Sequence, residues 1–197
     1  MRRPAFETIE APDFDLALTL DSGQVFHWEK CGRGFTGAID STAIYVEQRA
    51  NQLRIDRGAG ERVRRYFALD HSLPEIYATF PADKPMCAAR DLCRGLRIIR
   101  QPKWECLATF ITSSMKQVAH IRQMSRALRT RFGERIDTHG HELHAFPTAE
   151  RIAGCSESDL RACALGYRAA NLLATARRVS SDEANLDRWA DLKDEEL

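Results

Sequence analysis

The sequence lacks long apolar runs, and it has few lysines for its length. No apolar stretch approaches the roughly 20 residues that a membrane helix needs, and no apolar centre of a signal peptide follows the start Met1-Arg2-Arg3-Pro4. We therefore expect an intracellular protein with no membrane partner. The 197 residues are 44% hydrophobic and 29% charged, which is enough to bury the core of one or two ordinary domains.

The six cysteines have no recognisable disulfide or zinc pattern, since they lack Cys-x-x-Cys pairs and matching histidines. We expect them to be reduced and mostly packed inside. His139, His141 and His144 surround Gly140 in an expected loop, and their spacing permits a metal interpretation. The segment has no carboxylate or thiol placed to complete a ligand set, and surface loops commonly carry histidines. The sequence therefore predicts neither a metal nor a cofactor.

The net charge of +1 argues weakly against nucleic acid, because phosphate binding needs concentrated positive charge. The distribution of charge is uneven, however. Most basic residues are arginines, with a cluster between Arg90 and Arg135, whereas the stretch from Asp182 to Glu196 is strongly acidic. Arginine offers a planar fork of donors that matches phosphate. A GC-rich genome would also favour arginine codons, so both explanations stay open.

The front of the chain has the pattern of short strands separated by turn signals such as Asp21-Ser22-Gly23. Strands joined by such short turns must be antiparallel neighbours. The expected strands cover residues 16–20, 24–28, 34–39, 43–47 and 52–55.

After Gly60 the apolar spacing becomes helical. Expected helical stretches lie around residues 63–67 and 73–80, at 86–96, within 103–132, after 147 and 156, at 169–179 and around 186–192. The sequence thus predicts an α+β protein with a sheet region first and a helical region second.

Four segments together resemble the eukaryote-type 8-oxoguanine DNA glycosylases of the helix-hairpin-helix superfamily. Ser22–Trp28, with the sequence SGQVFHW, looks like their serine-glycine-glutamine signature, and Arg65–Asp70 resembles the end of their sheet domain. Arg97–Ser114 looks like the entrance to their helical domain, and Leu165–Ala169 is similar to a loop that they push into DNA. The segments follow the family's order and cover almost the whole chain.

The resemblance implies an N-terminal antiparallel sheet domain with helices, TBP-like, at residues 1–96. It implies part of an all-α helix-hairpin-helix glycosylase domain at residues 97–197. The implied function is base-excision repair: binding of double-stranded DNA that contains oxidised guanine, removal of 8-oxoguanine, and cleavage at the apurinic site. Such an enzyme must rotate the base out of the stack and brace the gap.

Tyr167 is the expected wedge, because a flat aromatic ring can replace lost stacking at the gap. Arg168 is similar to the arginine with which the family contacts the estranged cytosine. Taken alone, Gly166-Tyr167-Arg168 would be a helix C-cap glycine, a half-buried aromatic and a solvated cation. Gly23 is similar to the glycine whose carbonyl accepts a hydrogen bond from a ring nitrogen that is protonated only in the oxidised base. Unmodified guanine would meet that carbonyl with a lone pair.

The chain departs from the family where other members carry a run of asparagines, since it has Met115-Lys116-Gln117 there. His120 stands at the position of an arginine that touches the estranged base. We expect Met115, Lys116 and His120 to contact DNA, although Lys116 could equally be an exposed helix lysine. These departures leave open which base is preferred opposite the lesion.

The family's catalytic lysine and aspartate have no counterpart in this sequence. That lysine belongs to a hairpin with a Gly-Val-Gly-x-Lys-like turn, and the segment Asp191–Leu197 resembles the helix that leads into it. We therefore expect a truncated chain that is inactive alone and, with apolar surface uncovered, prone to self-association. A non-catalytic damaged-DNA-binding module and a remnant without DNA function remain alternatives.

Overall fold

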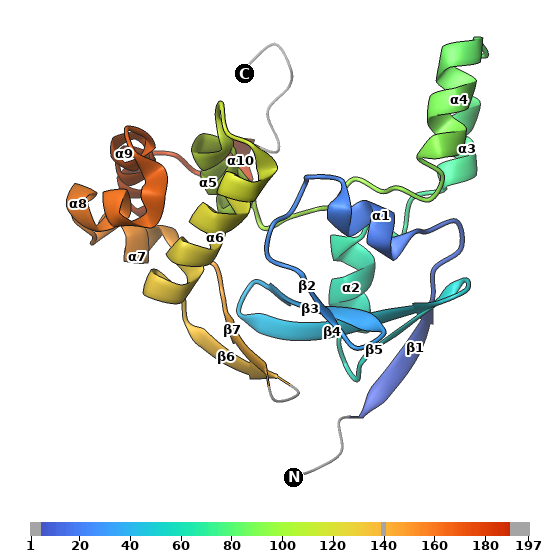
Figure 1. Ribbon diagram of the computed structural model, residues 1–197, viewed down its shortest axis with the longest axis horizontal. Coiled ribbons are helices and arrows are strands. Elements are labelled where there is room, and N and C mark those ends of the chain that lie inside the picture. Colours follow the sequence, from blue (N-terminus) through green and yellow to red (C-terminus); the bar gives the residue numbers. More distant parts are fainter. Residues whose placement is uncertain (1–4, 139–140, 190–197) are drawn as a thin grey trace. The chain divides into compact units, whose positions relative to one another are not determined.

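The computed structural model describes residues 5–138 and 141–189, and its chain divides into two compact units (Figure 1). The sheet unit contains the described residues of Met1–Ile39 and Ala43–Arg100. The helical unit contains those of Asp40–Thr42 and Gln101–Leu197. A sheet with covering helices followed by a mainly helical unit makes the protein α+β, as the sequence predicted.

The sheet unit is built on five antiparallel strands in the order β1-β5-β4-β3-β2. The strands are β1 (Phe6–Glu10), β2 (Glu29–Cys31), β3 (Gly34–Ile39), β4 (Thr42–Arg49) and β5 (Gln52–Asp56). The predicted strands at 34–39, 43–47 and 52–55 are confirmed. In the pairing of β4 with β5, Val46 lies opposite Ile55, and both side chains are fully buried. This register gives the sheet one apolar face.

Two expected strands are wrong, because residues 16–20 form a helix and residues 24–28 form an irregular loop. Helix α1 spans Leu16–Asp21, and the Asp15 carboxylate caps it by accepting a hydrogen bond from the amide of Leu18. Leu16 and Leu20 are four residues apart, so a helix turns both into the core, whereas the alternation had suggested a strand. The residues of the loop are held by side-chain contacts, described below.

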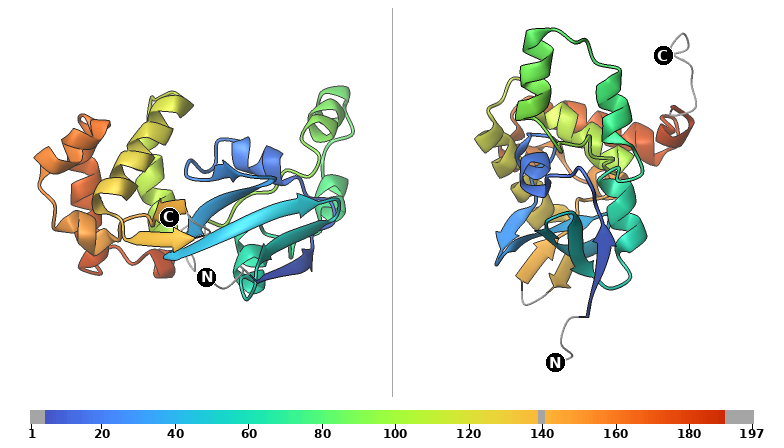
Figure 2. Two further views of the ribbon diagram at one scale, coloured as in Figure 1. Left: turned by 60° about the horizontal axis from the view of Figure 1, so that its bottom comes forward. Right: turned by 90° about the vertical axis from the view of Figure 1, so that its right-hand side faces the viewer.

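Helices α1 and α2 (Gly60–Tyr66) bury residues in the core beside the apolar face of the sheet. Figure 2 shows the molecule from two further sides. Buried residues of the helices and of the segments that follow them share one core cluster with strand residues such as Ile44 and Leu53. Helices α3 (Leu73–Ala78) and α4 (Lys84–Leu92) complete the sheet unit, and α4 buries no residue. The helical spacing predicted after Gly60 is thereby confirmed.

The helical unit contains seven helices and a hairpin within its described residues. They are α5 (Lys103–Ser113), α6 (Val118–Phe132), β6 (Arg135–Thr138), β7 (His141–His144), α7 (Ala149–Ala153), α8 (Glu157–Leu160), η1 (Arg161–Leu165), α9 (Arg168–Ser180) and α10 (Leu186–Trp189). Helix α9, on which Leu172 is fully buried, packs against α5, α7 and α8. Ser156 and Asp159 form a capping box at α8, as the serine there suggested.

A buried ion pair ties three of these elements together. The Arg129 guanidinium on α6 donates to the Glu105 carboxylate on α5 and, at 3.2 Å, to the carbonyl of His144 at the end of β7. Both charged side chains are almost fully buried. Burial raises the pKa of Glu105, and the neighbouring Arg129 opposes that shift. Removing one partner alone would leave an uncompensated buried charge.

The β6–β7 hairpin was not predicted, and the expectation of a histidine loop is wrong for the part that the structure describes. His141 and His144 lie on β7, where they pair with Thr138 and Arg135 on β6. His139 lies outside the described residues, as does the segment Asp191–Leu197. Within residues 5–138 and 141–189 there is no group of three possible metal ligands. In the same residues, none of the helices has the length and hydropathy of a bilayer-crossing segment.

Candidate nucleic-acid interface

A sharp corner precedes helix α9 in the helical unit. The chain leaves α8 through the π-helical turn η1, in which Ala164 adopts a positive φ of 63°, and Gly166 follows with a φ of 59°. Non-glycine residues rarely adopt such an angle, so Ala164 marks a kink in the chain rather than a regular helical turn. Tyr167, the next residue, is the N-cap of α9. The corner therefore sets an aromatic residue at the start of a thirteen-residue helix.

Tyr167 and Arg168 differ sharply in exposure. The Tyr167 side chain is 57% exposed, which suits a wedge, whereas Arg168 is only 4% exposed. The Arg168 guanidinium donates two hydrogen bonds to the carbonyl of Ser114, the one from Nε at 3.0 Å. Its Cζ atom also lies 4.3 Å from the centroid of the Tyr167 ring. Arg168 is thus not the solvated cation that the local pattern alone suggested.

The carbonyl that Arg168 holds belongs to the turn between α5 and α6. In this turn Met115 has a φ of 52° and is 92% exposed, and the amide of Lys116 donates to the carbonyl of Ser113 at 3.1 Å. Lys116 is exposed, as is His120 in the first turn of α6. The structure therefore brings the Met115–His120 segment together with the Tyr167 corner through Arg168. Their contact with DNA remains a prediction.

Gly23, in the sheet unit, lies in the loop that replaces the expected strand. Its φ of 87° belongs to a region that side chains disfavour, although a Cβ atom there would meet no atom within 4 Å. Gln24 fixes this loop: its amide nitrogen donates to Ser22 Oγ at 2.8 Å and to the carbonyl of Arg97 at 3.0 Å. Its amide oxygen accepts from the amide of Ile99 at 2.8 Å. The glutamine of the motif thus holds the glycine's backbone in place.

Trp28 anchors the other end of the same loop. Its indole nitrogen donates to the Tyr66 hydroxyl at 3.1 Å, and its ring packs against Tyr66 and Phe67. Gly37 on β3 leaves room for that ring, since a Cβ atom there would lie 2.5 Å from Trp28 Cδ2. Within the motif Ser22–Trp28, Gln24 and Trp28 therefore have a structural role, because their side chains hold the loop that contains Gly23.

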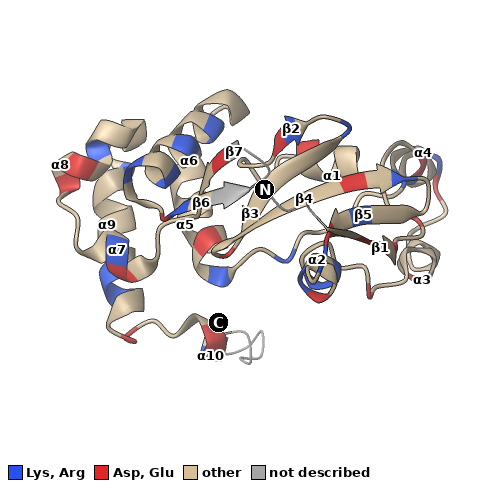
Figure 3. Cartoon of the chain, turned by 90° about the horizontal axis from the view of Figure 1, so that it is seen from below, with Lys and Arg blue, Asp and Glu red and all other residues tan. Residues whose placement is uncertain are grey.

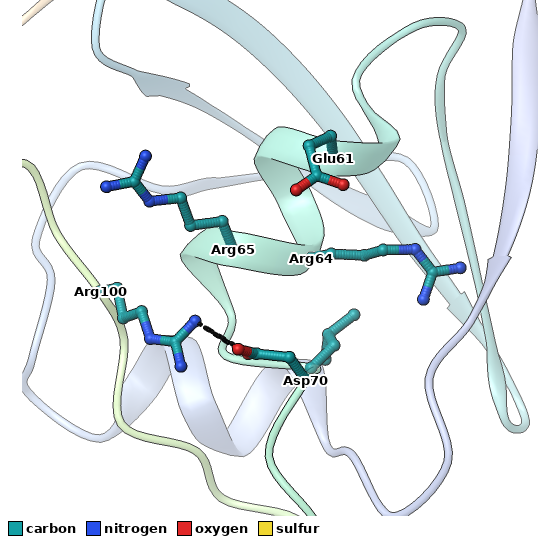
Figure 4. Close-up of a pocket in the computed structure, with 6 residues that line it drawn as sticks. Glu61, Arg64, Arg65, Asp70 and Arg100 are labelled. Atoms are coloured by element: carbon teal, nitrogen blue, oxygen red, sulfur yellow. Dashed lines mark hydrogen bonds and ion pairs between the residues drawn. The ribbon is translucent and has the colours of Figure 1, made fainter.

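The sheet unit also has an arginine-rich pocket of about 380 Å³ that sequence reasoning missed (Figure 4). Its lining residues are Glu61, Arg64, Arg65, Leu69, Asp70 and Arg100. The Arg100 guanidinium donates to both carboxylate oxygens of Asp70 at 2.8 and 2.9 Å and thereby lowers the pKa of that carboxyl. Arg100 and Asp70 are thirty residues apart in the sequence. No local sequence pattern therefore predicts that they line one pocket.

Charged side chains are distributed unevenly over the helices of the helical unit. Basic residues recur along α6, and acidic residues gather on α8 (Figure 3). Gln117 and Tyr167, the N-cap residues of α6 and α9, make no side-chain capping hydrogen bond. Uncapped helix starts offer backbone amides to anions. Charge and helix starts together make this unit compatible with a phosphate backbone.

A sheet unit followed by a helical unit, with an exposed aromatic side chain on a constrained corner, defines an α+β protein. Residues 8–107 match the family described as 8-oxoguanine DNA glycosylase, N-terminal domain. This match covers half of the chain, and the chain belongs to that family.

Among curated proteins, the chain is 30% identical over 205 residues to the N-glycosylase/DNA lyase of Saccharomyces cerevisiae, covering 93% of this chain and 54% of that protein. The structure of MBOgg1 in complex with a low-affinity DNA ligand matches with a TM-score of 0.91 at 26% identity, covering 98% of this chain and 69% of that one.

The Clostridium acetobutylicum 8-oxoguanine glycosylase/lyase is a further structural relative, solved in complex with double-stranded DNA containing cytosine opposite 8-oxoguanine. It matches with a TM-score of 0.87 at 25% identity, covering 96% of this chain and 70% of that one. The chain spans about half the length of the first curated relatives it matches.

Proposed function

We propose that this chain provides the damaged-DNA recognition part of a DNA N-glycosylase/lyase that removes 8-oxoguanine in base-excision repair. Its partner would be double-stranded DNA that contains oxidised guanine, in a DNA-containing compartment. The observation that carries the proposal is the Tyr167 corner, clamped to an exposed turn in a chain of this family. The two-unit domain division of the family at residues 1–96 and 97–197 is part of the same proposal.

The corner fits the task of bracing an opened duplex. Its aromatic ring is exposed, and buried contacts beneath it fix its backbone, so little conformational freedom is lost on insertion. Base–aromatic stacking contributes about 1–3 kcal/mol for each base. An exposed ring on a constrained turn can therefore compensate part of the cost of unstacking.

Gly23 would supply selectivity for the oxidised base through its backbone carbonyl. The hydrogen bonds of Gln24 support this assignment because they hold the loop in one conformation before any ligand binds. A fixed acceptor discriminates strongly, since a ligand without the matching donor leaves it unpaired. Lys116 and His120 would add contacts to the phosphate backbone or to the estranged base.

The proposal is tested by binding to a duplex with a tetrahydrofuran abasic site. Tyr167→Ala should weaken binding to this duplex roughly tenfold, which corresponds to the loss of one stacked base. Tyr167→Phe should retain most of the affinity because the ring remains. Fluorescence anisotropy against an undamaged duplex measures both effects.

Non-specific attraction between arginines and phosphates cannot produce a loss of affinity that is specific to the damaged duplex. A wild-type chain with equal affinity for damaged and undamaged duplexes would contradict the proposal, as would a Tyr167→Ala variant that loses affinity equally for both. Arg177→Ala on the same helix removes an exposed charge and serves as the control, with an expected small and unspecific loss.

Self-association is a separate part of the proposal. Phe110 is 75% exposed and Val118 46% exposed, so apolar side chains of the helical unit face solvent. Light scattering over a concentration series would detect the association that such surface favours.

A further inference from the structure

We propose that Arg33, Arg49 and Arg54 form a phosphate-binding site on the sheet unit, organised by the buried carboxylate of Glu47. The ligand is a phosphate group, either in the backbone of a DNA duplex or as the free ion. For the DNA backbone the inference rests on the proposed function, to which it adds a contact with DNA outside the helical unit.

The pairing of β4 with β5 places these side chains on one face of the sheet. Val46 is buried in the core, so Glu47, the next residue, points to the opposite face. Glu47 lies directly opposite Arg54 in the register, and Arg49 follows two residues later on the same strand and the same face. Arg33 reaches the same carboxylate from the turn between β2 and β3.

The contacts of the carboxylate leave many arginine N–H groups over. Glu47 Oε1 accepts from Arg33 Nε and Nη2 at 3.1 and 3.0 Å, and from Arg49 Nε at 3.0 Å. Its Oε2 accepts from Arg54 Nη1 at 3.0 Å and from Arg49 Nη2 at 3.3 Å. A carboxylate has about four lone-pair sites, whereas three guanidiniums carry many more N–H donors. In the described part of the chain, Nη1 of Arg33 and Nη1 of Arg49 donate to no acceptor.

The cluster carries an excess of positive charge, since one carboxylate meets three guanidiniums. Cations held this close repel one another, and a bound anion would relieve that repulsion. The excess faces solvent, because the side chain of Arg33 is 78% exposed and that of Arg49 is 52% exposed. Phosphate oxygens match the planar donor fork of arginine. The charge and the free donors therefore both fit a phosphate group.

Contacts behind the arginines fix the site before a ligand binds. The Glu47 side chain is only 4% exposed, and the Tyr45 hydroxyl donates to its Oε2 at 3.3 Å. The guanidinium of Arg54 lies over the Phe6 ring, with 3.5 Å between Cζ and the ring centroid. A site held in this way loses little conformational freedom when it binds an anion.

The test compares two substitutions that each remove one exposed arginine from the sheet unit of the 197-residue chain. Fluorescence anisotropy follows binding of an undamaged duplex over a range of salt concentrations. Arg33→Gln should lower the slope of log Kd against log salt by about 0.9 and weaken binding roughly eightfold at about 0.1 M salt, as the loss of one phosphate contact does. Arg57→Gln, outside the site, should change both values little.

Arg33→Lys separates an organised site from plain attraction between charges. It keeps the positive charge but loses the planar fork, so the salt slope should stay near that of wild type while the affinity falls roughly threefold. Wild-type affinity in Arg33→Lys beside a loss in Arg33→Gln would overturn the proposal, because charge alone would then explain the binding.

Inorganic phosphate tests the free ion as ligand. When phosphate replaces chloride at constant ionic strength, the melting temperature of wild type and of Arg57→Gln should rise more than that of Arg33→Gln. This result without an effect of Arg33→Gln on DNA binding would assign the site to the free ion. An effect of Arg33→Gln on the salt slope assigns it to the DNA backbone.

Equal behaviour of folded Arg33→Gln and Arg57→Gln in both measurements would overturn the proposal, and urea unfolding verifies that each variant is folded. Failure of the proposed function gives a different result. A wild-type chain that does not distinguish a tetrahydrofuran-site duplex from an undamaged one contradicts that function, whereas the comparison of Arg33 with Arg57 still decides whether the sheet unit binds phosphate.

Discussion

At the scale of single residues, Glu47 on β4 is the centre of a charged cluster on the sheet unit. Its buried carboxylate accepts hydrogen bonds from Arg33 and Arg49, and from Arg54 at 3.0 Å. The bond from Arg49 is the largest cause of a pKa lowered to about 2, with Arg33 and Arg54 adding to it against the effect of burial. One carboxylate thus balances three guanidiniums, from the turn between β2 and β3, from β4 itself and from β5.

The lowered pKa predicts a pH dependence of stability. Because the folded pKa lies below the unfolded value of 4.5, the contribution of Glu47 is present above pH 4.5 and disappears as the pH falls toward 2. Urea unfolding from pH 7 to pH 2 should therefore show a steeper loss for wild type than for Glu47→Gln. The difference should be about 2 kcal/mol, less than the full shift implies, because Arg33 and Arg49 are exposed. Parallel pH profiles for the two proteins would contradict this prediction.

The sequence predicts contact with DNA for four residues that the structure leaves exposed and for one, Arg168, that it buries. Tyr167, Met115, Lys116 and His120 are exposed, as residues that contact DNA must be. The contact of Arg168 with Ser114 spans 54 residues, and no local pattern signals it. Sequence reasoning could name Arg168 but could not determine where its guanidinium points.

At the scale of elements, β3 depends on a glycine for its contact with the Ser22–Trp28 loop. Gly37→Ala should lower the free energy of unfolding by about 2–3 kcal/mol, because the new methyl group would overlap the Trp28 ring. Chemical denaturation measures this change. In a Trp28→Ala background the same substitution should cost much less, since the ring is gone. Equal costs in both backgrounds would show that the strain arises elsewhere.

The elements that sequence misjudged are short ones whose pattern fits two structures. The alternation in residues 16–20 fits a strand. Asp15 instead caps a helix there, and the face of that helix with Leu16 and Leu20 is buried in the core of the sheet unit. The β6–β7 hairpin has only four residues in each strand, too few for a clear period. Longer elements such as α6 and α9 were predicted, because several turns of apolar spacing leave little ambiguity.

At the scale of the whole molecule, the position of the nucleophile can be tested. A Schiff base needs an unprotonated lysine amine, which burial or a cationic neighbour normally provides. Lys30, Lys84, Lys103 and Lys116, the lysines that the structure describes, are all exposed. We therefore expect no borohydride-trapped adduct between this chain and an 8-oxoguanine:cytosine duplex.

Denaturing electrophoresis and peptide mass mapping measure the adduct, with duplex binding in the same sample as the control. A trapped adduct would show that one of the chain's own lysines is the nucleophile. Binding without trapping would support a recognition part whose chemistry needs further residues.

The sequence by itself determined the α+β class, the longer helices, three of the strands and the family, because these follow from apolar periods and from motifs read along the chain. Only the tertiary structure decided that Gln24 fixes the Gly23 loop, that Glu47 gathers three arginines, and that Arg168 is buried beneath Tyr167. These features arise from residues far apart in the chain, and their hydrogen bonds form only after the backbone has folded.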